Sequence, residues 1–191
     1  MLVVALLAGC GGGDDDDTTE TAAAGQGAAG GEQSATPGVY VGQVGATDSS
    51  IALVTDGSRL TGAFLCIPKS TSQWVRPAPL DNGNAQLIAR RGVVLGSATF
   101  SGDTAAGKVQ AGGESDYNAK LASGYAGLYR TTSGTTNEPG FSETGWIVLP
   151  NGQVCGGTNT ITAGGGFESK PAPSKPDGSG RVTNFSNPFP F

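Results

Sequence analysis

Carboxylate side chains are the residues of this chain best suited to acid–base chemistry, because it contains no histidine. Two close pairs stand out, Glu114 with Asp116 and Glu138 with Glu143. Paired carboxylates hydrolyse glycosides when the fold holds them about 5–10 Å apart. Glu114 and Asp116, however, lie among Gly, Ser and Asp residues, which predicts solvent-exposed loop charges. Without histidine, His-dependent catalytic triads and His-ligated metals are excluded, so the composition favours binding over catalysis.

Two glycine-rich motifs resemble nucleotide-binding sequences, but neither has the context that nucleotide binding requires. Residues 25–30 match the dinucleotide fingerprint, but no strand precedes them and no helix follows. Residues 102–109 approach a phosphate-binding loop, yet Val109 replaces the magnesium-binding hydroxyl, so a β-turn is predicted instead. Nor does any Ser-x-x-Lys motif or nucleophile elbow occur. We therefore predict no catalytic, cofactor-binding or metal-binding residue.

Cys66 and Cys155 lie in two strand-like segments and form an even pair once the third cysteine, Cys10, is set aside. Disulfides persist outside the cytoplasm. We predict a Cys66–Cys155 disulfide, which would stabilise the fold by about 4–5 kcal/mol in the chain-entropy model. Two buried free thiols are the alternative.

The N-terminus is an apolar run that ends in a cysteine. Residues 2–8 are too few to span a bilayer, which takes about 20 residues. Residues 7–10, Leu-Ala-Gly-Cys, resemble the lipobox of bacterial lipoproteins. The resemblance implies a signal segment at 1–9 and lipidation of Cys10, which would be the first mature residue. Signal segments normally begin with Lys or Arg, and none precedes this run; a start site placed too far downstream would explain the difference. The alternative is a short apolar N-terminus with a cysteine there by chance.

Residues 10–36 lack the apolar side chains needed for a core. Four consecutive aspartates at 14–17 lead into a Gly- and Ala-rich stretch, a composition typical of a disordered spacer rather than of a calcium loop. Residues 1–35 hold six acidic residues and no basic one, so the formal charge of −5 belongs to the spacer. The acidic balance of the chain argues against an electrostatic nucleic-acid binder, whereas the remaining residues are nearly neutral and so say nothing about the charge of a partner.

Residues 37–167 alternate short apolar stretches with turn residues and show no helical period. Asp56-Gly57 is a type I′ hairpin signal, and Asn82-Gly83 is a second hairpin signal. We predict an all-β domain of about ten strands in an antiparallel meander, either a small up-and-down barrel or a sandwich. The expected strands are 38–44, 51–55, 59–67, 73–76, 85–89, 93–100, 106–111, 119–122, 125–130, 145–149 and 153–155.

Aromatic residues of this segment are the candidates for its core: Tyr40, Phe64, Trp74, Phe100, Tyr129 and Trp146. Residues 168–191 are predicted to be a Pro-rich C-terminal tail. The alternative for its end is docking of Phe185, Phe189 and Phe191 on the domain or on a partner.

Short Gly- and aromatic-rich segments resemble a group of uncharacterised secreted or lipid-anchored actinobacterial proteins. The segments are 38–42, 102–107, 125–130 and 145–152. The resemblance covers about 38–155 and implies an extracytoplasmic β-domain, without assigning a catalytic residue.

These features predict a lipoprotein on the extracytoplasmic face of a bacterial membrane. Its β-domain is expected to bind a ligand or an envelope partner. A secreted hydrolase that uses carboxylates and a purely structural envelope component are the alternatives. An open barrel interior would favour the binding function. Two facing carboxylates would favour the hydrolase, and a filled core without a cleft would favour the structural role. The expected partners are the membrane, through the lipid, and an unknown ligand or envelope component, but not nucleic acid.

Overall fold

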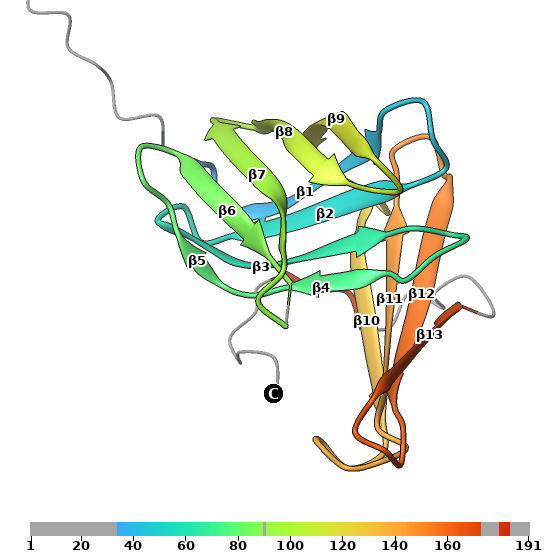
Figure 1. Cartoon of the computed structure of the whole chain (residues 1–191). Helices are drawn as coiled ribbons and strands as arrows, with labels where there is room; N and C mark the ends of the chain where they lie inside the picture. The colour runs from blue at the N-terminus through green and yellow to red at the C-terminus, as the bar shows by residue number, and fades with distance from the viewer. Residues whose placement is uncertain (1–33, 90, 173–179, 184–191) are drawn as a thin grey trace, which may run out of the picture. The chain divides into compact units, whose positions relative to one another are not determined.

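The computed structural model describes residues 34–89, 91–172 and 180–183, and this part of the chain is built from β-strands (Figure 1). The described residues form 13 strands and no helix, which confirms the predicted all-β class. Nine strands belong to a first sheet: β1 (Gly38–Val44), β2 (Ser50–Thr55), β3 (Arg59–Cys66), β4 (Gln73–Val75), β5 (Ala78–Pro79), β6 (Asn84–Ile88), β7 (Val94–Ser101), β8 (Thr104–Gln110) and β9 (Glu114–Leu121). Four belong to a second sheet: β10 (Gly127–Ser133), β11 (Ser142–Val148), β12 (Val154–Ile161) and β13 (Phe167–Pro171).

The first sheet forms a nearly closed barrel. Its strands are paired in the order β4-β3-β2-β1-β9-β8-β7-β6, every pair antiparallel, while the short β5 pairs with β3. The two ends of this path meet at an antiparallel bridge between Val75 and Ala89. There the Arg76 N–H donates to the Ile88 carbonyl at 2.9 Å. Because neighbours along the chain are neighbours around the barrel, the topology is the predicted up-and-down meander.

The barrel interior is packed with apolar side chains from all eight strands of that path. Tyr40 and Phe100 meet edge to face there, with ring centroids 5.2 Å apart. The Tyr40 hydroxyl lies 2.6 Å from the Thr36 and Gly102 carbonyl oxygens, and burial is the main cause that raises its pKa. Buried members of this cluster include Tyr40, Ile51, Leu53, Leu65, Val75, Leu87, Phe100, Val109 and Tyr117.

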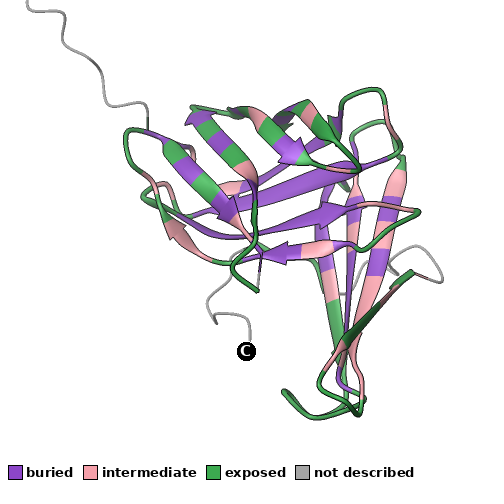
Figure 2. Ribbon diagram, in the orientation of Figure 1, coloured by how far each residue is buried: buried purple, intermediate pink, exposed green. Residues whose placement is uncertain are grey.

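The second sheet packs on the outer face of the barrel at β1–β4. Figure 2 shows the consequence, since β2 and β3 are buried along almost their whole length whereas β6–β9 alternate between buried and exposed residues. Phe64 and Trp74 lie at this junction with ring centroids 4.3 Å apart. The junction cluster comprises Val39, Val41, Ala52, Val54, Phe64, Cys66 and Trp74 from the barrel side, and Ala126, Leu128, Ile147, Leu149, Cys155 and Val182 opposite them.

The two predicted hairpin turns differ in type. Asn82 and Gly83 have φ angles of 48° and 77°, as a type I′ turn requires. At Asp56-Gly57 only the glycine has a positive φ, of 95°, so the predicted type I′ turn is wrong there. The Asp56 carboxylate instead accepts hydrogen bonds from the Ser58 and Arg59 amides, both at 2.9 Å. Desolvation raises the pKa of Asp56, but the hydrogen bond from the Ser58 hydroxyl, together with these two amide bonds, outweighs it and lowers the pKa.

The domain extends beyond its predicted end. The tail expected from Glu168 overlaps β13, which pairs with β12 from Ile161↔Phe167 to Gly157↔Pro171. Further along, Val182 is buried and its N–H donates to the Leu128 carbonyl at 2.8 Å. The proline-rich composition hid these contacts, because an edge strand tolerates proline where its N–H faces away from the sheet. Phe185, Phe189 and Phe191 lie outside the described residues.

Five of the six predicted core aromatics are buried: Tyr40, Phe64, Trp74, Phe100 and Tyr129. Trp146 is half-buried on β11 and packs against Gly156, where an added Cβ would lie 2.5 Å from its ring.

Candidate functional site

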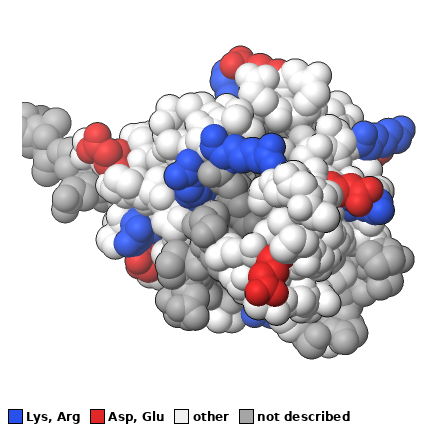
Figure 3. Space-filling model, turned by 60° about the horizontal axis from the view of Figure 1, so that its bottom comes forward, with Lys and Arg blue, Asp and Glu red and all other residues white. Residues whose placement is uncertain are grey.

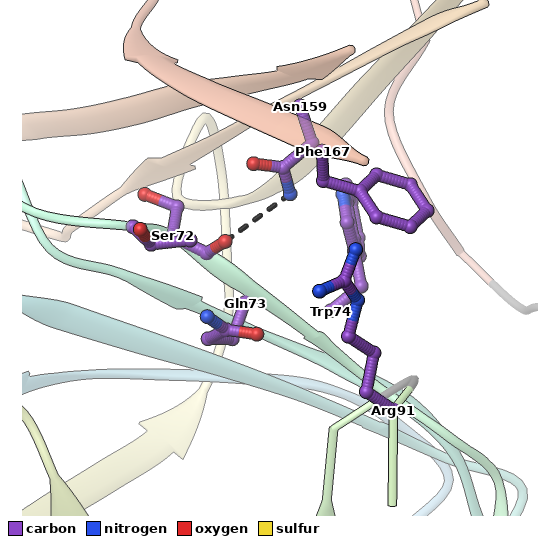
Figure 4. Close-up of a pocket in the computed structure, with 7 residues that line it drawn as sticks. Ser72, Gln73, Trp74, Arg91, Asn159 and Phe167 are labelled. Atoms are coloured by element: carbon purple, nitrogen blue, oxygen red, sulfur yellow. Dashed lines mark hydrogen bonds between the residues drawn. The ribbon is translucent and has the colours of Figure 1, made fainter. Parts of the chain in front are cut away.

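A pocket of about 220 Å³ lies at the junction between the barrel and the second sheet. The loop before β4 and β4 itself form one wall, β12 and β13 form the other, and the β6–β7 turn supplies a side chain at the rim. Figure 4 shows these side chains around a common space. Ligand pockets usually measure about 300–1,000 Å³, so this one fits a small molecule or the end of a longer one. Its lining is Thr71, Ser72, Gln73, Trp74, Arg91, Asn159 and Phe167.

Hydrogen bonds across the junction hold the two walls together. The Asn159 amide donates to the Ser72 carbonyl at 3.1 Å, and the Ser72 N–H donates to the Ser169 hydroxyl at 3.2 Å. Gly157 permits this approach, because a Cβ there would lie 2.4 Å from the Ser72 Oγ atom. The pocket is therefore part of the folded domain, with walls from segments that are distant in sequence.

Arg91 supplies the positive charge of the pocket. Its guanidinium carbon lies 4.8 Å from the centroid of the Phe167 ring, a cation–π distance. Among the described residues, no carboxylate pairs with Arg91 or with Arg76, whose Nε donates to the Ala89 carbonyl at 3.3 Å. The Arg76 guanidinium lies close to Gly92, the residue after Arg91, because a Cβ added at Gly92 would lie 3.4 Å from the Arg76 Nη2 atom.

Positive charge is visible on this side of the molecule. Figure 3 turns the lower side of Figure 1 toward the viewer and shows Lys and Arg side chains gathered near its middle. Val93, in the β6–β7 turn with Arg91, is 58% exposed, and Val94, the first residue of β7, is 51% exposed. Within the described residues, the β6–β7 turn thus places an arginine without a carboxylate partner next to exposed apolar side chains.

A second, more open pocket of about 390 Å³ lies beside β10. Residues 180–183 form one side of it, and Arg130, Thr131 and Thr132 form the other. Arg130 is engaged in an ion pair with Glu143, and Arg181 donates to the Ala126 carbonyl at 3.0 Å. Its two cations are thus already held by the protein, unlike Arg91.

The predicted carboxylate pairs do not come together in a pocket. Glu143 is buried and ion-paired, whereas Glu138 is exposed in the β10–β11 turn. Neither of the two pockets described above has Asp or Glu in its lining. The described linings of these two pockets therefore hold no facing carboxylate pair of the kind that glycoside hydrolysis uses.

Glu114 and Asp116 were expected in a turn but lie in β9, which begins at Glu114 rather than at Ala119. Both are exposed, as predicted, and lie 2.9 and 3.6 Å from the Lys108 ammonium on β8. The hydrogen bond from Lys108 to Glu114, together with the charge of Asp116, raises the pKa of Lys108. Exposed cross-strand pairs of this kind stabilise a sheet weakly.

The resemblance of residues 102–109 to a phosphate-binding loop has a simple structural explanation. Gly102 has a φ of 53° in the turn between β7 and β8, and strand β8 follows at once. The predicted β-turn is confirmed. The other glycine-rich motif, at 25–30, lies outside the described residues.

Cys66 and Cys155 form the predicted disulfide, with their Cα atoms 6.0 Å apart. It joins β3 of the barrel to β12 of the second sheet, so it fixes the junction at which the pocket lies. Cys10, the predicted lipidation site, lies outside the described residues.

The pocket residues were not predicted as a site. Phe167 was predicted only as the last residue of the domain, and Arg91 was not assigned a role. Trp74 was predicted to belong to the core, which it does, with 1% of its surface exposed. The available signal for a binding site was Arg91, an exposed arginine in a turn, because binding residues often lie on loops. A single arginine in a turn does not by itself indicate a site.

No protein-family model, curated protein or solved structure matches the chain. Within the described residues, there is no helix with the length and apolar character needed to cross a membrane. In the same part of the chain, no group of three or more Cys, Asp or Glu side chains is placed to hold a metal ion.

Proposed function

We propose that this protein is a lipid-anchored binding protein of the bacterial cell envelope. Cys10 carries the lipid, residues 10–36 act as a spacer, and the β-domain binds a small ligand or one end of an envelope component. The Cys66–Cys155 disulfide supports an extracytoplasmic location, because disulfides persist mainly in oxidising compartments.

The pocket at the barrel–sheet junction is the observation that carries the binding function. The barrel interior is filled with side chains, so a ligand binds outside it. The pocket combines an apolar floor at Trp74 with amide and hydroxyl groups and, at its rim, Arg91, which has no carboxylate partner among the described residues. Such a mixture of apolar surface and a few polar groups is typical of ligand sites.

A purely structural envelope component is the second candidate, favoured by the filled barrel. The two candidates differ in one respect: only a binding protein loses its activity when the pocket is blocked. Thr71 is exposed in the lining, so Thr71→Trp would fill the pocket without disturbing the core.

Binding is tested on the full-length chain with Cys10→Ser by amide and indole NMR against a panel of sugars, amino acids and aromatic acids. The proposed function predicts shifts at Gln73, Trp74 and Asn159 with at least one class of compound. The same compounds should shift nothing in the Thr71→Trp variant. A panel without any effect at these residues would favour the structural role.

Anchoring is tested separately in a bacterial host. The protein should enter the membrane fraction and incorporate labelled fatty acid, and Cys10→Ala should abolish both. Two acyl signals or more hold a protein stably on a membrane, so release should be nearly complete. A Cys10→Ala protein that stays in the membrane fraction would contradict the lipid anchor.

A further inference from the structure

We infer that the ligand of the barrel–sheet pocket is a small organic anion, with its anionic oxygen group bound by Arg91 and its apolar body against Trp74 and Phe167. This inference rests on the proposed function and names the chemical class of its ligand. Three observations support it: Arg91 has no carboxylate partner among the described residues, its guanidinium lies over the Phe167 ring, and Trp74 and Phe167 line the pocket beside it.

The charge of Arg91 has no counter-ion among the described residues. Exposed Lys108 and Lys170 each have a carboxylate within 3.0 Å, and Arg130 is paired with Glu143. Arg91 lies in the β6–β7 turn and Arg76 directly follows β4, and no described carboxylate lies within ion-pair distance of either. Glu168 follows Phe167 but pairs with Lys170 at 3.0 Å. The mouth of the pocket is therefore positive, which attracts anions.

The Arg91 guanidinium lies over the Phe167 ring, with its central carbon 4.8 Å from the ring centroid. A cation–π contact does not require the N–H edges of the guanidinium to donate hydrogen bonds. Those edges form the planar fork that binds a carboxylate or phosphate through two parallel hydrogen bonds. Figure 4 shows the guanidinium on the same side of the pocket as Phe167 and Trp74, opposite Ser72.

The size and the other walls restrict the rest of the ligand. A space of about 220 Å³ admits a body about as large as one ring. Trp74 and the 44% exposed Phe167 provide apolar contact, and Gln73, Ser72 and Thr71 provide polar groups on the other side. An anion with a compact apolar body can contact both the apolar side chains and the polar side chains of this pocket.

The test compares benzoate with benzamide, which have the same shape and differ in charge, by NMR titration of the full-length Cys10→Ser chain. Hydrogen bonds to a charged group in a half-open site should make benzoate bind on the order of tenfold more tightly. Shifts are expected at the amides of Gln73 and Arg91 and at the Trp74 indole. Phenyl phosphate is the third arm, and the tighter of the two anions identifies the anionic group as carboxylate or phosphate.

Variants assign the effect to Arg91. Arg91→Gln should reduce benzoate binding to the level of benzamide, and Arg91→Lys should retain part of the difference, because lysine keeps the charge but not the fork. Lys120→Gln removes an exposed cation of β9 and is the matched control, which should bind like the parent chain. Salt should weaken benzoate but not benzamide between about 0.01 and 1 M, where the screening length falls from about 30 to about 3 Å.

Equal binding of benzoate and benzamide, or discrimination that survives Arg91→Gln, would overturn the anion inference and leave the binding function standing. Binding of neutral sugars from the panel without binding of either anion would overturn it too. If nothing in the panel binds at the pocket, the proposed function itself fails.

Discussion

Arg130 on β10 and Glu143 on β11 form an ion pair at the barrel–sheet junction, with Arg130 Nε 2.5 Å from Glu143 Oε1. The Glu143 side chain is 1% exposed and that of Arg130 is 22% exposed. The Arg130 guanidinium also lies over the Trp74 ring, 5.9 Å from its centroid. A carboxylate this deeply buried needs a cation beside it, so the pair connects the inner side of the second sheet to the floor of the proposed site.

Arg130→Met should destabilise the protein strongly, because it leaves the buried Glu143 carboxylate without its cation. Breaking one side of a buried pair costs about 3–5 kcal/mol. Urea unfolding of the variant and the parent measures the difference. Lys108→Met, which breaks an exposed pair on the barrel, is the matched control and should change the midpoint little. Equal effects of the two substitutions would show that the Arg130–Glu143 pair has no special role.

Gly145→Ala should also destabilise the fold, for a steric reason. A Cβ at Gly145 would lie 2.8 Å from both Phe64 Cε1 and Trp74 Cζ2, so the two sheets would have to separate. Overpacking of this kind costs about 1–3 kcal/mol. Gly164→Ala is the control, because nothing lies within 4 Å of the added atom. A Gly145→Ala protein as stable as Gly164→Ala would contradict the tight packing at this junction.

Part of the barrel was predictable because four of its eight paired strands, β6–β9, face water on one side. In β6 the buried Ala85 and Leu87 alternate with the exposed Gln86, which gives a clear period of two. In β2 all six residues are buried, since the barrel core covers one face and the second sheet the other. A continuous apolar stretch such as β2 indicates that both faces of a strand are buried, but it does not indicate which element covers the outer face.

The pocket was not predictable, because only tertiary contacts bring its walls together. Ser72 and Asn159, which share a hydrogen bond, are separated by 87 positions in the chain. The close approach depends on Gly157, and glycine in a strand does not indicate whether a bulge, a bend or a neighbour requires it. Pairing of Cys66 with Cys155 was predictable once Cys10 was set aside, and it was the one long-range contact that could be predicted.

Removal of the disulfide should lower stability by about 4–5 kcal/mol at most, the chain-entropy value for a loop of 89 residues. Urea unfolding of Cys66→Ala/Cys155→Ala in the Cys10→Ser background measures the loss. Alkylation of denatured, unreduced Cys10→Ser protein should add no mass, and reduction should expose two thiols. Two alkylated thiols without reductant would contradict the bridge.

Alkaline pH should unfold this protein through its buried tyrosines, chiefly Tyr117. Burial raises the pKa of Tyr117 well above its ordinary value of 10.0, and its hydroxyl donates to the Ser97 carbonyl at 2.9 Å. Above pH 10 the unfolded chain loses this proton while the folded protein keeps it. The contribution to stability is therefore complete below pH 10 and declines as the pH rises from there toward the higher folded pKa.

Tyr117→Phe separates the titration from the packing. Near pH 8 it should cost about 1 kcal/mol for the lost hydrogen bond. Between pH 10 and 11.5 its free energy of unfolding should fall less steeply than that of the parent, by up to about 1.4 kcal/mol per pH unit for one proton. Tyr125→Phe, at a side chain 89% exposed, should leave the alkaline slope unchanged. Parallel slopes for the parent and Tyr117→Phe would show that ionisation of Tyr117 is not coupled to unfolding.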